Sequence, residues 1–182
     1  MGRVTAEQSR REIVEVATGM FAARGYEATS LAEIAAEWGG SKATVLYHFR
    51  TKAAILHDLV APAAEALAGV IDKAGCLSPA DARREVALGF VDLAIDRREA
   101  LACYPAALRH IVEMPELEDL GLREMGDRLM HLLTAGADDP LSHAAATVFL
   151  NGVLVAAQTQ DDVPADDLRD VLATLAARVL AL

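Results

Sequence analysis

Aromatic residues are scarce in this sequence, at 4% of 182 residues, and cysteine occurs only twice. Because 53% of the residues are still hydrophobic, a core must be built mainly from Ala, Leu and Val, and frequent Ala and Leu favour helix throughout. Cys76 and Cys103 form no C-x-x-C pair. We interpret both as reduced thiols of a cytoplasmic protein, with a disulfide or redox role as the lesser alternative.

The common signatures of catalysis are also missing. There is no Glu-x-x-His pair, H-E-x-x-H, G-x-S-x-G or phosphate-binding loop, so an enzyme on a helical scaffold is an alternative without positive support. The spacings of Cys103, His110 and His131 match no known metal site, and we predict no metal, no cofactor and no catalytic residue. The N-terminal residues are polar and lack the apolar core of a signal peptide, which predicts that the protein is not secreted.

Basic residues are too few to balance the acidic ones, and the net charge is −10. Taken over the whole chain, this charge argues against a nucleic-acid-binding protein. The distribution is uneven, however, because residues 1–60 are neutral in sum and the whole excess lies in residues 61–182. Residues 38–57 contain no Asp or Glu, while Lys42, Arg50 and Lys52 are basic. This stretch is a locally basic candidate surface, and the acidic remainder keeps the protein soluble or turns it away from DNA.

The stretch SLAEIAAEWGGSKATVLYHFRTK, beginning at Ser30, has the layout of a helix-turn-helix. Ser30 and Glu33 form a capping box, so a first helix should begin there and end near Trp38. The Gly-Gly pair at 39–40 supplies the positive φ or tight bend of the turn, and Ser41 caps a second helix.

This second helix is the candidate DNA reader. Val45 and Phe49 lie on its buried side, and a rotation of about 100° per residue places a different set opposite them. The exposed face consists of Ala43, Thr44 and Tyr47, flanked by Lys42 and His48. Small, hydroxyl, phenol and cationic side chains on a short helix suit the major groove of DNA.

Residues 13–56 resemble the N-terminal domain of the TetR family of transcriptional regulators. The residues that carry the resemblance are Ala17, Phe21, Gly25, Tyr26, Thr29, Ile34, Ala35, Gly39, Ser41, Lys42, Ala43, Thr44, Tyr47, His48, Phe49, Lys52 and Leu56. The resemblance implies DNA contacts by Thr29, Ser41, Lys42, Ala43, Thr44, Tyr47, His48 and Lys52. Three positions depart from the family pattern: Gly40 replaces a buried valine, Trp38 an alanine and Leu46 a tyrosine. We expect Trp38 to fill the space at Gly40, with a weakened turn as the alternative.

The helix before this motif should open with a capping box at Thr5 and Gln8 and end at Gly25. Its predicted buried side is Ile13, Ala17, Met20 and Phe21. Arg3, Arg10 and Arg11 lie at its start and could reach phosphate, or could simply be solvated.

A long helix is predicted from Thr51 and Lys52 to Ala74, linking a DNA-binding domain (residues 1–51) to an effector-binding and dimerisation domain (residues 52–182). Pro62 should kink it, because the proline ring removes a hydrogen bond and crowds the preceding turn. In the second domain, Ser78 and Pro79 begin another helix.

Prolines at 105 and 115 break the helices that follow and predict gaps between them. We place an effector pocket there, with Met and aromatic side chains forming an adaptable apolar wall. The candidate lining residues are Phe90, Tyr104, Leu108, His110, Met125 and Met130; the alternative for each is an ordinary core position.

Residues 141–160 carry no formal charge. Their length suggests a membrane span, but seven polar side chains and the absence of basic flanks argue against it. A helix apolar nearly all round must be covered on more than one side, so we predict a two-fold dimer through a four-helix bundle with the last helix. The predicted interface residues are Val148, Leu150, Leu154, Leu168, Leu172, Leu175 and Val179.

The sequence thus predicts an all-α protein of about nine helices. Its predicted function is that of a cytoplasmic, homodimeric repressor that binds a palindromic operator in double-stranded DNA and is released by a small apolar or amphipathic effector. The alternative is a helical ligand-binding or scaffold protein whose DNA reader has decayed. The reason for this alternative is Gly40, which could weaken the turn before the reader helix.

Overall fold

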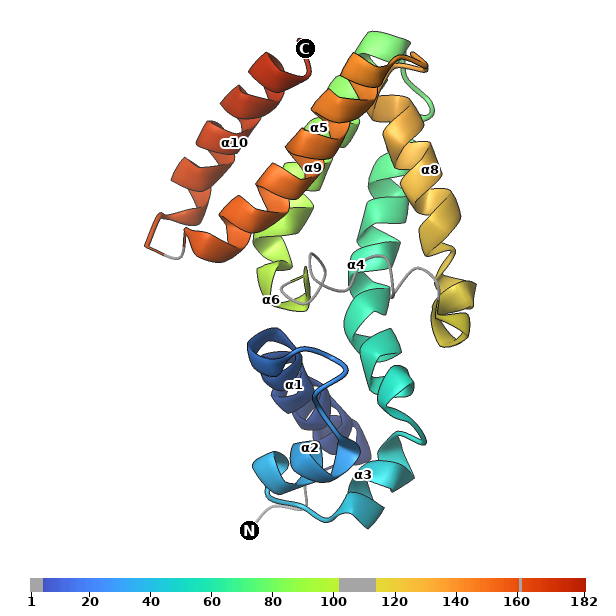
Figure 1. Ribbon diagram of the computed structural model, residues 1–182, viewed down its shortest axis with the longest axis vertical. Coiled ribbons are helices and arrows are strands. Elements are labelled where there is room, and N and C mark those ends of the chain that lie inside the picture. Colours follow the sequence, from blue (N-terminus) through green and yellow to red (C-terminus); the bar gives the residue numbers. More distant parts are fainter. Residues whose placement is uncertain (1–4, 102–113, 161) are drawn as a thin grey trace.

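The computed structural model describes residues 5–101, 114–160 and 162–182, with the side chains of residues 99 and 100 also left out. Within these ranges the chain is helical and contains no strand, in agreement with the predicted all-α class (Figure 1). The elements are α1 (Ala6–Arg24), α2 (Leu31–Trp38), α3 (Lys42–His48), α4 (Lys52–Ala74), α5 (Pro79–Asp96), α6 (Arg98–Leu101), the 3-10 helix η1 (Pro115–Leu120), α8 (Leu122–Leu133), α9 (Pro140–Thr159) and α10 (Ala165–Val179).

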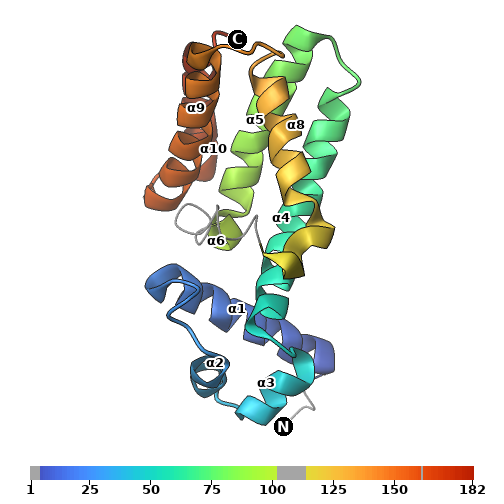
Figure 2. The same cartoon turned by 45° about the vertical axis from the view of Figure 1, so that its right-hand side comes forward.

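The helices form two parts joined by α4. Helices α1, α2 and α3 make a small module at the N-terminal end, and α4 runs from it into a body built from α5, α8, α9 and α10 (Figures 1 and 2). In the body, α4 packs against α5 and α8, and α10 packs against α5 and α9. The order of elements therefore places the candidate reader, α3, at the tip farthest from α9 and α10.

Helix α1 has the predicted bounds but only half of the predicted cap. The hydroxyl of Thr5 accepts from the backbone N–H of Gln8 at 3.2 Å. The Gln8 side chain does not return the bond to Thr5; its amide donates to the Glu12 carboxylate at 3.2 Å instead. The predicted capping box is therefore wrong, because Glu12, one turn further on, offers Gln8 a charged acceptor.

Helix α4 also has the predicted bounds. The Thr51 hydroxyl caps it by accepting from the Ala54 N–H at 3.1 Å, and Gly75 follows its end. The helix continues through Pro62, whose side chain is exposed. The predicted kink at Pro62 stays a prediction.

Buried apolar side chains gather in two clusters. The first, here called the reader cluster, joins α1–α3 to the first half of α4 and to η1; its buried members are Ile13, Ala17, Met20, Phe21, Ile34, Ala35, Val45, Phe49, Ile55, Leu56, Leu59, Val60, Ala64, Leu117 and Leu122. The reader cluster continues past residues 51 and 52, so the predicted domain boundary separates two helices but not two cores.

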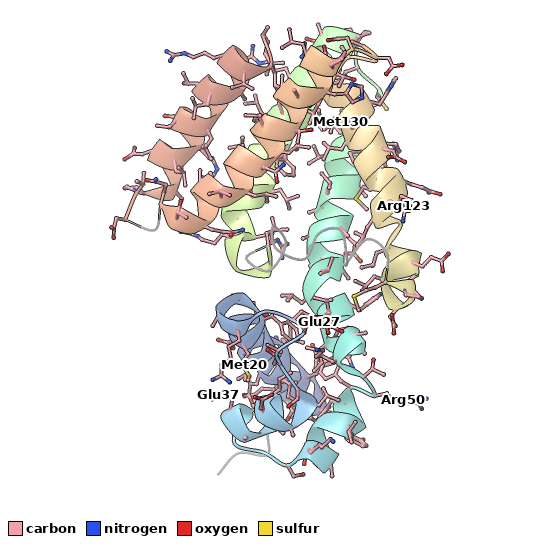
Figure 3. All side chains as sticks on the ribbon, viewed as in Figure 1. Met20, Glu27, Glu37, Arg50, Arg123 and Met130 are labelled. Atoms are coloured by element: carbon pink, nitrogen blue, oxygen red, sulfur yellow. The ribbon has the colours of Figure 1, made fainter. Side chains whose placement is uncertain are left out.

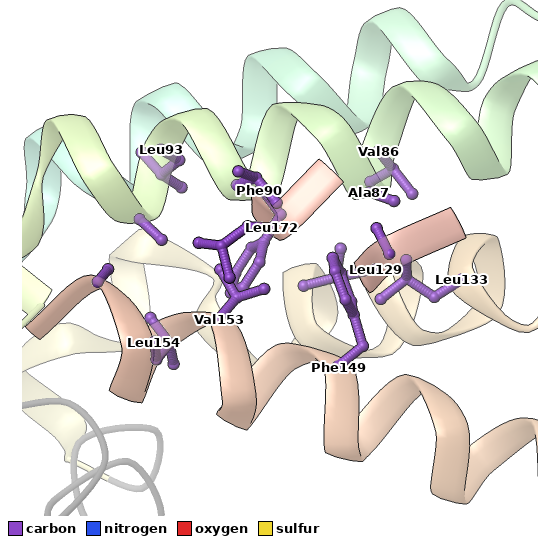
Figure 4. Packing of buried hydrophobic residues seen from close by; sticks show 14 of the residues in the cluster. Val86, Ala87, Phe90, Leu93, Leu129, Leu133, Phe149, Val153, Leu154 and Leu172 are labelled. Carbon is purple, nitrogen blue, oxygen red and sulfur yellow. The ribbon is translucent and has the colours of Figure 1, made fainter. Parts of the chain in front are cut away.

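The second cluster, here called the body cluster, fills the space between α4, α5, α8, α9 and α10. Figure 4 shows its centre, where Phe90 of α5 faces Phe149 and Val153 of α9. The two phenyl rings have centroids 6.2 Å apart. Met125 packs, partly buried, against both clusters, which makes the start of α8 their meeting point.

Two described helices, α4 and α9, are long and apolar enough to cross a membrane when judged by length and composition alone. Core helices of soluble proteins pass the same test, and both clusters include buried residues of α4. Helix α9 differs, since part of its apolar surface faces outward.

Candidate DNA-binding and effector sites

The turn between α2 and α3 has the geometry that the sequence predicts. Ser30 and Glu33 form a complete capping box, with bonds of 2.9 and 3.3 Å, and hydrogen bonds from Ser30 lower the pKa of Glu33. Gly39 has a φ of 82°, in the left-handed region. The N–H groups of Gly39 and Gly40 donate to Ala36 and Ala35, a Schellman ending that satisfies the last carbonyls of α2.

Trp38 occupies the space that Gly40 leaves empty, as expected. A Cβ added at Gly40 would lie 2.4 and 2.5 Å from two ring carbons of Trp38. The indole Nε1 donates to the Glu12 carboxylate of α1 at 3.1 Å, which anchors the ring. Gly40 and Trp38 are therefore a matched pair, and their shared departure from the family pattern leaves the turn filled.

Helix α3 presents its predicted face to solvent. The hydroxyl of Ser41 accepts from the Thr44 N–H at 3.1 Å and so caps the helix. Val45 and Phe49 are buried, and the exposed residues are Lys42, Ala43, Thr44, Leu46 and Tyr47. The Tyr47 side chain is the most prominent, because the residue is 81% exposed and its ring meets His48 edge to face. Arg50 points outward just beyond α3 (Figure 3).

Thr29 does not belong to this exposed face. The residue is 2% exposed, and its hydroxyl donates to the Gly25 carbonyl at 2.9 Å. A hydroxyl so placed stabilises the bend between α1 and α2 and has no access to DNA. The DNA contact implied for Thr29 is therefore wrong.

Lys52, at the start of α4, is engaged inside the protein. Its ammonium donates to the Tyr26 carbonyl at 2.6 Å and lies 4.0 Å from the centroid of the Tyr26 ring. Burial, followed by the charges of Glu27 and Glu116, raises the pKa of Tyr26 to about 12. Because the ammonium has three N–H groups, the phosphate contact stays a prediction, and Lys52 also ties α4 to the turn after α1.

Arg10 is engaged as well, contrary to the reading in which it reaches for phosphate. Its guanidinium binds Asp58 of α4 and the carbonyl of His48, at the end of α3. Arg11 is largely exposed, and Arg3 lies outside the described residues. No pattern in the sequence links Arg10 to Asp58, because the two residues lie on different helices.

An apolar cavity of about 420 Å³ lies between α4, α5, α8 and α9. This volume is in the range of small-molecule sites. Of the predicted lining residues, Phe90, Met125 and Met130 do line it, whereas Tyr104, Leu108 and His110 lie outside the described residues. The lining also includes Leu67, Leu93, Leu101, Leu122, Leu150 and Leu154.

The polar groups of this cavity, which no pattern in the sequence indicated, are Arg123, Asp127, Thr147 and Asn151. Asn151 donates to the Thr147 carbonyl at 2.9 Å, which leaves its amide oxygen as an acceptor. Arg123 and Met130 lie on α8, one near each end of the helix (Figure 3). On each of α8 and α9 the two polar residues lie four positions apart, so each pair shares one face of its helix. This spacing indicates a common site only once the two helices are known to face each other.

The cavity wall is continuous with the reader cluster. Leu122 and Met125 line the cavity and also pack into that cluster, beside Leu117 of η1. A polar contact reinforces the link, since the His57 Nε2 of α4 lies 3.0 Å from an Asp119 carboxylate oxygen of η1. Residues 114–125 thus touch both the candidate effector site and the module that carries α3.

The predicted dimer face needs a correction. Leu154, Leu168 and Leu172 are buried within the subunit, so these three are wrong as interface residues, whereas Leu150 is partly buried and lines the cavity. Their spacing matched an apolar stripe, but that stripe points into the body cluster. The exposed apolar residues of α9 and α10 are Leu141, Val148, Val155, Val171, Leu175 and Val179. Val148, Leu175 and Val179 keep their predicted exposure.

Helices α2 and α3, with the turn between them, have the layout of a helix-turn-helix, a motif that many DNA-binding proteins use. Residues 13–59 match the model of the family described as bacterial regulatory proteins, tetR family. No curated protein matches the sequence. The match is therefore confined to the N-terminal segment, and the whole chain shares its fold with solved regulators of that family.

Three solved structures illustrate the shared fold. The ketosteroid transcriptional regulator KstR2 of Mycobacterium tuberculosis is 18% identical, with a TM-score of 0.76 over 98% of this chain and 97% of that chain. A tetR-family regulatory protein from Rhodococcus RHA1 is 21% identical, with a TM-score of 0.71 over 96% of each chain. AibR, solved in complex with isovaleryl coenzyme A and operator DNA, is 18% identical, with a TM-score of 0.64 over 92% of this chain and 97% of that chain.

Proposed function

We propose that this protein is a cytoplasmic, homodimeric transcriptional repressor that binds a palindromic operator and is released by a small apolar or amphipathic effector. The exposed face of α3 carries the proposal: a capped helix presents Lys42, Thr44 and Tyr47 outward and contains no carboxylate. Such a helix fits the major groove, where these side chains reach base edges and phosphates.

The dimer is proposed from the outer face of α9 and α10. Val148 is 63% exposed, Val171 53% and Leu175 45%, and the two helices lie side by side on one flank of the body (Figures 1 and 2). Solvent exposure of this apolar strip is unfavourable in a lone subunit. A second copy of the chain would cover it and would place two copies of α3 on the same side of the DNA.

The effector is proposed to occupy the cavity beside Phe90 and Met130. Its wall is apolar, and Arg123, Thr147 and Asn151 offer a few polar contacts, which suits a ligand with an apolar body and a polar end. Isovaleryl coenzyme A, named with AibR, is one ligand with such an acyl part.

Release from DNA is proposed to pass through residues 114–125. A ligand that displaces Leu122 or Met125 acts on the reader cluster, because both side chains pack there. A shift of η1 would then move the first half of α4 through Leu117 and the contact between His57 and Asp119. Coupling of this kind typically amounts to about 1–3 kcal/mol.

The alternative is a helical ligand-binding or scaffold protein with a decayed reader. The reason for considering it was the missing side chain at Gly40, and the Trp38 ring lies where that side chain would be. The caps of α2 and α3 are also complete.

Selection from a pool of random-sequence duplexes with the purified protein tests the proposal. The expected result is enrichment of a palindrome whose half-sites lie about one helical turn apart, as in other dimeric helix-turn-helix proteins. Recovery of unenriched sequences after several rounds would contradict it.

A further inference from the structure

Arg10 makes an unusually complete set of contacts for a partly exposed side chain. Its Nε donates to one Asp58 oxygen at 2.6 Å and its Nη2 to the other at 2.8 Å. Its Nη1 donates to the His48 carbonyl at 2.9 Å, and its guanidinium carbon lies 4.2 Å from the centroid of the Phe49 ring. Each of the three guanidinium nitrogens therefore donates a hydrogen bond within the protein.

These contacts meet at the end of the reader helix. His48 is the last residue of α3, so its carbonyl has no partner within the helix, and a cation there is favourable. Phe49 follows it and is buried, while Asp58 belongs to the second turn of α4. One side chain of α1 thus fixes the end of α3 against α4.

Few other contacts fix the orientation of α3 relative to α1 and α4. It has seven residues, of which only Val45 is fully buried. Ser41 fixes its first turn, and Arg10 is the charged contact at its last. A bidentate guanidinium fork adds geometric specificity that a lysine ammonium does not reproduce.

We infer that Arg10 is a positioning residue that sets the angle of the reader helix for sequence-specific binding, and not a DNA contact. The inference rests on the proposed function. Loss of the fork should leave general attraction to DNA intact, because that attraction depends on charge. It should lower affinity for the cognate sequence, because base contacts require the helix at one angle.

The test compares Arg10→Lys with Arg11→Lys, its exposed neighbour, since both substitutions keep the charge. Affinities are measured by fluorescence anisotropy for the duplex that the wild type selects and for a random duplex of equal length, at a temperature where circular dichroism reports folded protein. Arg10→Lys should lose about tenfold or more on the selected duplex and nothing on the random one. Arg11→Lys should match the wild type on both.

Two results would overturn the inference: wild-type affinity of Arg10→Lys for the selected duplex, or an equal loss on both duplexes. If Arg10→Lys does not fold, Asp58→Asn takes its place, because it breaks the charged fork and leaves the bond to His48. Unchanged selectivity of folded Asp58→Asn would then overturn it. A wild type that does not prefer the selected duplex would instead refute the proposed function, which keeps the two failures distinct.

Discussion

At the scale of single residues, the pairing of Trp38 with Gly40 explains how this turn tolerates a departure from the family pattern. The indole ring takes the place of the missing side chain and is held by Glu12. Two substitutions that look independent in the sequence are one packing solution in space. A sequence comparison flags both positions, but only coordinates reveal that they compensate.

Gly40→Val should therefore be destabilising in the wild-type background. The new side chain would collide with the Trp38 ring, and overpacking of this kind typically costs about 1–3 kcal/mol. The combined substitution of Trp38→Ala and Gly40→Val should cost less than the sum of the two single changes. Urea unfolding of the four proteins gives the coupling, and strict additivity would refute the pairing.

Lys52 illustrates a residue with two candidate roles. Its position at the start of α4 implies a phosphate contact, while its bond to the Tyr26 carbonyl ties α4 to the turn after α1. Loss of DNA binding after Lys52→Ala would thus have two explanations. Tyr47 is the better probe, because it is 81% exposed and its ring packs only against His48 among the described aromatic contacts.

At the scale of helices, the sequence was most informative where local signals act. The starts of α2, α3, α4 and α5 follow from Ser and Thr at their N-caps, and the ends of α2 and α4 follow from the glycines after them, because these residues act on the backbone of their own helix. The buried side of α1 followed from its helical spacing.

The same reasoning failed for α10, which carries two apolar stripes. Leu168, Leu172 and Ala176 point into the body cluster, while Val171 and Leu175 point outward. The stripes are offset by three residues, so a single list of leucines mixes them. The neighbouring helices decide which stripe faces the core, and the local sequence pattern carries no information about them.

This distinction makes the dimer testable on α10. Leu175→Glu places a charge on the exposed apolar strip and should convert the dimer to a monomer, because a buried unpaired charge costs several kcal/mol, on the order of 3–5. Ala177→Glu is the matched control, since it lies on the other exposed side of the same helix. Analytical ultracentrifugation measures the mass, and a dimeric Leu175→Glu protein would contradict the proposed interface.

At the scale of the whole molecule, the arrangement separates the acidic part of the chain from the proposed DNA reader. The net charge of −10 resides in residues 61–182, and α4 holds that part away from α3 (Figure 1). The carboxylate-free stretch at 38–57 lies at the tip. The charge distribution along the chain predicted this separation, and α4 provides it by connecting the N-terminal module to the body.

The contact between the cavity wall and the reader cluster could not be predicted from the sequence. Leu122 and Met125 belong to a helix far from α3 in the chain, yet they pack into its cluster. Contacts between such distant segments arise from the packing of complete helices, for which local spacing carries no signal. Cavity residues on α8 and α9 were missed for the same reason.

The most direct test of the central claim is the affinity of wild type and Tyr47→Ala for the selected duplex, measured by anisotropy over a series of salt concentrations. We predict tight binding by the wild type that weakens steeply as salt rises, through release of counterions. Tyr47→Ala should bind at least about tenfold more weakly while keeping the wild-type mass and unfolding temperature. Equal affinity of the two proteins would contradict the assignment of α3 as the DNA reader.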